Sequence, residues 1–180
     1  MKQPDSNAAL LGFILSDDKS SYTVTAPEAN ISGKLIIPSE YNNLPITKIA
    51  RSAFNGCREL AEITLPNTLT EIGIEAFSAC HSLDNVTVPG SVKKICEEAF
   101  SCCLKLSSLT LENGIKAIDD AAFLCCSSLS SLTLPESIEH IGEYAFARCE
   151  ALVEVIIPAS FPDIDETVFS ECENVKIVRK

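Results

Sequence analysis

The chain has 180 residues, of which 46% are hydrophobic and 22% are charged. This length suits one domain with its own core, and the composition excludes a disordered chain. The formal net charge of −11 excludes a general nucleic-acid binder, because such proteins present a basic surface to phosphates. No apolar run approaches the length of a membrane-spanning helix, so we expect no membrane insertion.

Residues 1–33 lie outside the repeat described below and are expected to form an N-terminal cap. The apolar run 13–15 and the β-branched run 22–25 flank a polar stretch, a pattern that predicts a hairpin. A signal peptide is the alternative interpretation of the apolar run 8–15. Asp5 lies within the segment that should be positively charged, and no small-residue cleavage site follows the run. We therefore favour a strand.

A repeat of 23 residues begins in an enlarged first unit, at 34–57, and continues to the end of the chain. Four columns of side chains follow this spacing. They are Phe54, Phe77, Phe100, Phe123, Phe146 and Phe169; Cys57, Cys80, Cys103, Cys126, Cys149 and Cys172; Ile49, Ile72, Ile95, Ile118, Ile141 and Ile164; and Leu60, Leu83, Leu106, Leu129, Leu152 and Val175. A fixed period of this size is typical of stacked units that bury their apolar sides against each other. The sequence predicts a solenoid of about six units over 34–180.

Each unit combines a strand signal with a return signal. In the unit that begins at Leu83, apolar residues at 83, 86 and 88 precede Pro89, which predicts a short strand with one buried face. The following segment 95–103 has apolar residues at helical spacing over about one or two turns. We therefore expect short helical or irregular returns and an α/β fold class.

The unit resembles that of the BspA-like leucine-rich-repeat family, LxxIxLPxxLxxIgxxAFxxCxx. Segment 60–80, LAEITLPNTLTEIGIEAFSAC, matches nearly every fixed position, and the resemblance covers 34–180. It implies a right-handed solenoid with a parallel sheet on its concave side, and a role in binding or adhesion. Two departures are Glu112, which replaces the proline after the third strand, and the irregular last unit around 161–169.

The chain stops at Lys180, inside the expected last strand, with no polar cap after it. An uncovered solenoid end exposes apolar surface and an open strand edge. Two interpretations remain open. Either Arg179 and Lys180 protect this edge, or the edge pairs with a second chain in a homodimer.

Nine cysteines are too few for a disulfide scaffold, and their odd number excludes complete internal pairing. We expect the six column cysteines to be small buried thiols, since residues stacked about 4.8 Å apart with parallel Cβ bonds fit a disulfide poorly. Cys102 and Cys125 adjoin the column, with Cys96 nearby, where a disulfide or a metal site is the alternative.

The thiols and the lack of a convincing signal peptide predict a cytoplasmic location. A secreted or cell-surface location is the alternative if the N-terminus has been trimmed.

Strand residues that point away from the core form the main candidate surface, on the concave sheet. They are Glu62, Thr64, Asn85, Thr87, Ser108, Thr110, Ser131, Thr133, Glu154 and Ile156. Packing between strands explains the threonine ladder without any function. The functional interpretation is a mildly polar surface that binds a protein partner. It has no large aromatic residue, so we expect modest affinity.

A weaker candidate is a column of acidic residues at the start of the returns. Its members are Glu97, Asp120, Glu143 and Glu166. If short helices begin here, their N-termini favour acidic residues, which explains the column structurally. The alternative is a convex stripe that binds a cation or a basic partner.

Catalysis has little support in the sequence. There is no GxSxG, Walker or GxGxxG motif, and the two histidines, His81 and His140, leave few possible bases for a triad. There is no CxxC pair, so we expect no zinc site and no cofactor. We predict a non-enzymatic protein-interaction module. An exported adhesin or host-factor binder is the first alternative, and a cation-binding protein that uses the acidic column is the second.

Overall fold

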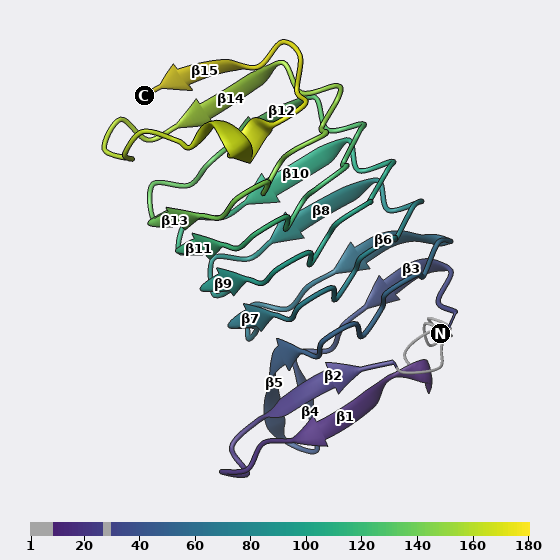
Figure 1. Cartoon of the computed structure of the whole chain (residues 1–180). Helices are drawn as coiled ribbons and strands as arrows, with labels where there is room; N and C mark the ends of the chain where they lie inside the picture. Colours follow the sequence, from purple (N-terminus) through teal and green to yellow (C-terminus); the bar gives the residue numbers. More distant parts are fainter. Residues whose placement is uncertain (1–8, 27–29) are drawn as a thin grey trace, which may run out of the picture.

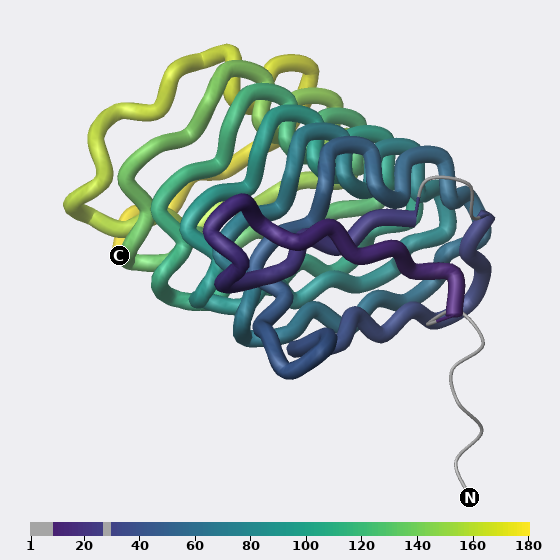
Figure 2. The backbone as a smooth tube through the Cα atoms, turned by 90° about the horizontal axis from the view of Figure 1, so that it is seen from below, coloured from purple at the N-terminus to yellow at the C-terminus, as the bar shows by residue number. Residues whose placement is uncertain are grey.

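The structure, a computed structural model, describes residues 9–26 and 30–180. Within these residues the chain winds into a β-solenoid whose seven long strands lie along one side of the molecule (Figure 1). The long strands are β3 (Gly33–Ile36), β6 (Leu60–Thr64), β8 (Asn85–Val88), β10 (Ser108–Leu111), β12 (Ser131–Thr133), β14 (Glu154–Ile157) and β15 (Lys176–Arg179). The coils stack along one axis (Figure 2), as the repeat predicts.

The long strands form two parallel sheets that follow one another along the solenoid. β3, β6, β8 and β10 make a four-stranded sheet, and β12, β14 and β15 make a three-stranded sheet. Side chains of β8, β10 and β12 alternate between exposed and buried, as the sequence pattern predicts. The expected parallel sheet is therefore confirmed, with a break between β10 and β12 that the sequence does not show.

A third sheet, here called the short-strand sheet, is not predicted by the sequence and lies on another side of the coils (Figure 1). It contains β5 (Leu44–Ile49) and the two-residue strands β7 (Glu71–Ile72), β9 (Lys94–Ile95), β11 (Ala117–Ile118) and β13 (His140–Ile141). Each two-residue strand ends at a member of the isoleucine column. Two residues are too few to show an alternation, so sequence reasoning places them within the returns.

The N-terminal cap contains the predicted hairpin. β1 (Gly12–Leu15) pairs antiparallel with β2 (Tyr22–Thr25), and β2 pairs parallel with β5, so this hairpin continues the short-strand sheet. The extra residues of the first unit form another hairpin, in which β4 (Glu40–Tyr41) pairs antiparallel with β5. Tyr41 stacks on Phe13 with ring centres 4.1 Å apart, which joins the two hairpins. Asp5 and the first residue of the apolar run 8–15, which bear on the signal-peptide interpretation, lie outside the described residues.

The sequence predicts helical or irregular returns, and the helical form does not occur in most of the coils. The returns are turns, and helix occurs in only one of them, as the 3-10 helix η2 (Glu166–Phe169). The structure is thus almost entirely strand and turn within the described residues, and the α/β fold class is not confirmed.

Two left-handed residues in each of the regular returns explain why no helix forms. The first set is Ser52, Glu75, Glu98, Ala121 and Tyr144, and the second is Gly56, Ala79, Cys102, Cys125 and Arg148. Right-handed helix requires negative φ at every residue. Instead, alternate N–H groups donate to the next coil, as Phe100 does to the Ala122 carbonyl at 2.7 Å. The returns therefore join the coils by a backbone ladder of their own.

Stacked phenylalanines fill the core beneath this ladder. Neighbouring rings from Phe54 to Phe146 lie 5.0–5.2 Å apart between centres and within 13° of parallel. Such offset stacks stabilise the core beyond the burial of apolar area alone.

Among the described residues, no helix has both the length and the hydrophobicity needed to cross a membrane.

Candidate functional site

The outward side of the seven long strands, here called the long-strand face, carries the ten residues predicted as a binding surface. Nine of them are exposed, and Ile156 is half-buried. The alternation that exposes them buries their neighbours, such as Val86 and Leu132, in the core. The structure therefore brings all ten residues together on one face.

Strand register arranges these residues in two rows that run along the solenoid. The first row is Lys34, Glu62, Asn85, Ser108, Ser131, Glu154 and Lys176, and the second is Ile36, Thr64, Thr87, Thr110, Thr133, Ile156 and Val178. Sequence reasoning missed the four end members, Lys34, Ile36, Lys176 and Val178. Their units are enlarged or irregular, but the alternation of Leu35 with its neighbours could have revealed the first two.

The middle of the long-strand face offers hydroxyl and amide groups that no protein group uses. Among the described residues, the hydroxyls of Thr64, Thr87, Thr110 and Thr133 have no protein hydrogen-bond partner, nor do the side chains of Asn85, Ser108 and Ser131. An ion pair lies instead at the N-terminal end of the face, where Lys34 Nζ is 3.4 Å from Glu62 Oε2. The polar groups in the middle are available to water or to a partner.

Two hollows open on the long-strand face where neighbouring strands pair weakly. One, of about 320 Å³, lies between β6 and β8, which share a single paired position, and Thr64 and Asn85 contribute to its lining. The other, of about 290 Å³, lies between β10 and β12, which belong to different sheets. Thr110 and Thr133 line this second hollow. The face is therefore grooved, not flat.

A rigid turn borders the long-strand face where Glu112 departs from the repeat. The Glu112 carboxylate accepts the Gly90 N–H at 3.0 Å, a contact that proline could not make. Gly90 and Gly114 lie so close that a Cβ on either would collide with the backbone of the next or preceding coil. The exception to the proline pattern thus has a structural cause.

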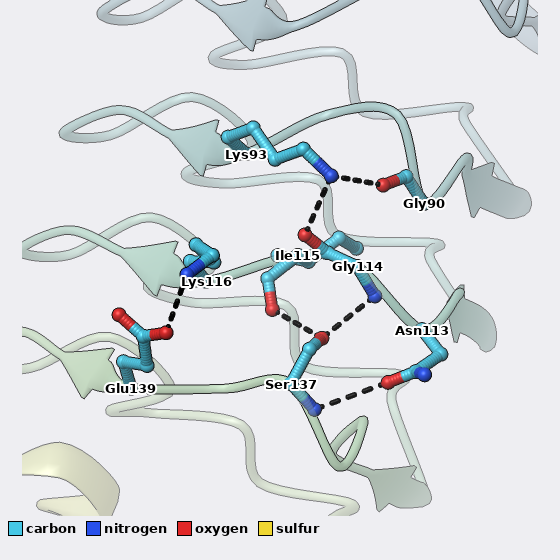
Figure 3. Close-up of polar contacts among 8 residues, drawn as sticks. All are labelled: Gly90, Lys93, Asn113, Gly114, Ile115, Lys116, Ser137 and Glu139. Atoms are coloured by element: carbon cyan, nitrogen blue, oxygen red, sulfur yellow. Dashed lines mark hydrogen bonds and ion pairs between the residues drawn. The ribbon is translucent and has the colours of Figure 1, made fainter.

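Side chains extend this turn into a network that joins three coils (Figure 3). Lys93 Nζ donates to the carbonyls of Gly90 and Gly114 at 3.0 and 3.2 Å. Ser137 accepts the Gly114 N–H at 2.7 Å and donates to the Ile115 carbonyl at 2.6 Å. The network fixes one border of the long-strand face.

The cysteine column is buried, as predicted, with Cys172 in the last unit partly buried. Each thiol from Cys80 to Cys172 donates to the carbonyl of a phenylalanine in the preceding coil, at 3.3–3.4 Å. Burial raises the pKa of Cys80 and of Cys149 to about 12. The column therefore consists of neutral thiols that pack and donate, a role the spacing alone could not reveal.

The explanation of the acidic column by helix N-termini is wrong for Glu97, Asp120 and Glu143, because their returns are not helical. It holds only at η2, where Asp165 caps the helix and Glu166 lies in its first turn. At Asp120 the carboxylate instead joins two coils, because its Oδ1 accepts the Glu143 N–H at 2.9 Å.

No described group of three or more histidine, cysteine or acidic residues is arranged to hold a metal ion. The cation-binding interpretation of the acidic column therefore gains no support. His140 is exposed and lines a hollow of about 170 Å³ with Asp163 and Asp165. His81 is half-buried and has no protein hydrogen-bond partner among the described residues.

At the C-terminal end, β15 pairs with β14 and has no second neighbour among the described strands. Ile177 is 45% exposed there. Arg179, which one of the two interpretations assigns to edge protection, donates to the Pro162 carbonyl at 3.3 Å and lies 3.1 Å from Asp163. It therefore holds the last, irregular turn in place.

The family model described as "BspA type Leucine rich repeat region" matches residues 47–176 in six copies. The chain belongs to this family. Leucine-rich repeats of this kind are commonly found in protein-interaction or surface proteins, and they are typically non-enzymatic. A search of curated proteins finds no match.

Among solved structures, this leucine-rich-repeat chain is similar to the leucine-rich-repeat protein TpLRR of T. pallidum, with 26% identity and a TM-score of 0.90. That match covers 100% of this chain and 84% of the other. A leucine-rich-repeat protein from Bacteroides ovatus has 27% identity and a TM-score of 0.74 over 92% of this chain, which spans about half (51%) of that protein. The pneumococcal vaccine antigen PcpA shares the fold at 20% identity, a TM-score of 0.57 and coverage of 81% and 50%.

These comparisons give no support to the predicted cytoplasmic location. The secreted or cell-surface alternative is consistent with the family, whose repeats are common in surface proteins.

Proposed function

We propose that this chain is a non-enzymatic protein-binding module that presents the long-strand face to a protein partner. The observation that carries the proposal is the middle of the two parallel rows, where, within the described part of the chain, the exposed threonine, serine and asparagine side chains have no protein hydrogen-bond partner. Buried columns hold the coils rigidly, so the rows lose little conformational entropy on binding. The acidic column and the His140 hollow lack a comparable array.

The composition of the face fits a partner with polar groups and a few apolar ones. Hydroxyl and amide groups recur about every 4.8 Å along the solenoid, the spacing of hydrogen-bonded strands. The two hollows would accept side chains, and Ile156 and Val178 add apolar surface at the C-terminal end. No aromatic residue anchors the interface, so several coils must contact the partner together.

Paired variants with equal added charge test this assignment. Ser108→Arg with Ser131→Arg changes the middle of the long-strand face, whereas Leu104→Arg with Tyr144→Arg changes exposed residues outside it. Capture of binding proteins from the cells of origin and from their exterior should fail with the first variant and persist with the second. The reverse pattern contradicts the proposal.

We also propose an exported location in place of the cytoplasmic one, since the repeats of this family are common in surface proteins and a pneumococcal vaccine antigen shares the fold. Fractionation of cells that produce the chain tests it. Recovery on the surface or in the medium supports export, and recovery only in the cytosol contradicts it.

The homodimer through the edge of β15 stays a prediction, favoured by the exposed Ile177. Sedimentation over a range of concentrations tests it, and a constant monomer mass would end it. Ile177→Lys should abolish any dimer that forms, because it places a charge in the contact.

A further inference from the structure

Cys102 and Cys125 differ from the other cysteines in their surroundings. Both are half-exposed and lie outside the buried column, next to their column neighbours Cys103 and Cys126. All nine cysteines lie in the described part of the chain, and all are thiols. Cysteines in consecutive coils also form pairs within the column, but at least one thiol of each of those pairs is buried. Cys102 and Cys125 are the only pair in which both thiols reach solvent and neither donates to a phenylalanine carbonyl.

The backbone places these two thiols one above the other on the outer corner of the solenoid. Cys102 donates its N–H to the Leu124 carbonyl at 2.7 Å, and Cys125 donates its N–H to the Ala147 carbonyl at 2.9 Å. Both residues are left-handed, with φ of 58° and 59°, so they occupy the same position in successive turns. Their side chains therefore leave the backbone in the same direction from adjacent coils.

The next position in this series is Arg148, which completes a small charged site. Its Nε lies 3.0 Å from Glu171 Oε2, which holds the guanidinium at this corner. Burial raises the pKa of Cys125, the nearby Cys102 thiol raises it further, and Arg148 opposes both effects. Cys125 thus lies close enough to interact with both the Cys102 thiol and the Arg148 guanidinium, and the guanidinium favours its thiolate against the effect of burial.

We propose that Cys102 and Cys125 are a thiol–disulfide exchange site that closes to a disulfide on reaction with low-molecular-weight disulfides. One thiolate of the pair attacks a sulfur of the small disulfide RSSR, which breaks its S–S bond and releases one RS⁻. The second thiolate attacks the protein sulfur of the mixed disulfide and releases the other RS⁻. The two thiol protons end on the released thiolates, so the protein dithiol and RSSR give a protein disulfide and two RSH.

Disulfide closure is easier at this corner than within the cysteine column. Adjacent coils are about 4.8 Å apart, which falls inside the usual Cα separation of a disulfide, but the Cβ atoms must approach to about 3.8 Å. In the column, packed phenylalanines and the thiol–carbonyl hydrogen bonds resist that movement. At the corner the side chains border solvent, so they can tilt toward each other. Oxidation would join two coils on the side away from the long-strand face.

Intact mass after treatment with oxidised glutathione tests the proposal on the native, full-length chain. The sample is quenched with acid, unfolded, alkylated and weighed. The expected product has seven alkylated thiols of the nine and no glutathione adduct. Nine alkylated thiols, a stable glutathione adduct on the unmodified sequence, or oxidation only after unfolding would each overturn it.

Single variants identify the pair, because each thiol adjoins a column cysteine and peptide mapping alone cannot separate them. Cys102→Ser and Cys125→Ser should each stop at one glutathione adduct, since the resolving thiol is missing. Cys96→Ser, at a site outside the pair, should still form the disulfide. An internal disulfide in either variant of the pair, or its loss in Cys96→Ser, contradicts the assignment.

Arg148 acts as a positioning residue, and its contribution has a separate readout. Arg148→Gln should move the pH dependence of the reaction to higher pH while the same disulfide still forms. An unchanged pH profile would remove Arg148 from the site.

Discussion

The long strands and the returns of each coil make their backbone hydrogen bonds to neighbouring coils in different ways. The long strands use ordinary parallel ladders, leave alternate side chains exposed, and open two hollows where pairing weakens. The returns use left-handed residues to direct alternate N–H groups to the next coil. The backbone ladder of the returns thus joins neighbouring coils closely, whereas the exposed residues of the long-strand face can differ from coil to coil. This difference is what makes that face the better candidate for binding.

The largest contrast should come from truncating one core residue in each region. Phe100→Ala removes a fully buried ring from the stack beneath the returns and should cost about 4 kcal/mol of unfolding free energy. Leu109→Ala, beside the hollow between β10 and β12, should cost about 2 kcal/mol. Urea denaturation measures both values. Equal losses would show that the hollow does not loosen the long-strand face.

Glycine substitutions separate close packing from backbone strain. Gly90→Ala places a Cβ against the Asn113 carbonyl and should cost about 2 kcal/mol, as overpacking does. Gly56→Ala, in a return, meets nothing within 4 Å and suffers only from its φ of 75°, so it should cost about 1 kcal/mol. Thermal or urea denaturation gives the order, and a larger loss for Gly56→Ala would contradict it.

The buried thiols of the returns predict sensitivity to alkaline pH. The folded pKa of Cys80 and of Cys149 is about 12, above the ordinary 9.0, so the unfolded chain loses these protons first. Their contribution is complete below pH 9 and is lost as pH rises toward 12. Each thiol should remove about 1.4 kcal/mol of stability per pH unit within that window.

Comparison of the wild type with Cys80→Ala isolates this effect. The variant starts from a lower stability but should lose it less steeply between pH 9 and 10. Identical slopes would mean that Cys80 ionises in the folded chain.

The smallest expected effect comes from replacing two alanines of the returns by glycine, one with a positive φ and one with an ordinary φ. Ala79 has φ of 58°, so Ala79→Gly should stabilise the fold by about 0.5 kcal/mol, because the relief of strain exceeds the entropy cost of glycine. Ala99 is buried with an ordinary φ, and Ala99→Gly should destabilise. The same sign for both substitutions would argue against a strained return.

Much of the architecture could be predicted from side chains that face the core. The 23-residue columns and the alternation at 83, 86 and 88 reveal the stacking and the long strands. The returns could not be predicted, because Ile95, Ala99 and Phe100 have the spacing of a helix although Glu98 is left-handed. Nothing about glutamate or alanine signals that conformation, which contacts between coils impose.

The candidate face shows the same limit. Its ten residues follow from alternation alone, and the structure adds Lys34 and Lys176 at the ends of the first row. The hollows depend on where two ladders weaken, and no residue pattern marks that point. The hydrogen bonds of the cysteine column likewise depend on the position of the phenylalanine carbonyls.

Photo-crosslinking from a single position tests the central claim most directly, because it captures a partner whose identity is unknown. A photoreactive phenylalanine analogue replaces Ser108 on the long-strand face or, in the matched control, the exposed Leu104. The account predicts one discrete crosslinked protein from position 108 and none from 104. Crosslinks from 104 alone would contradict it and would place the binding surface on the outer side of the coils.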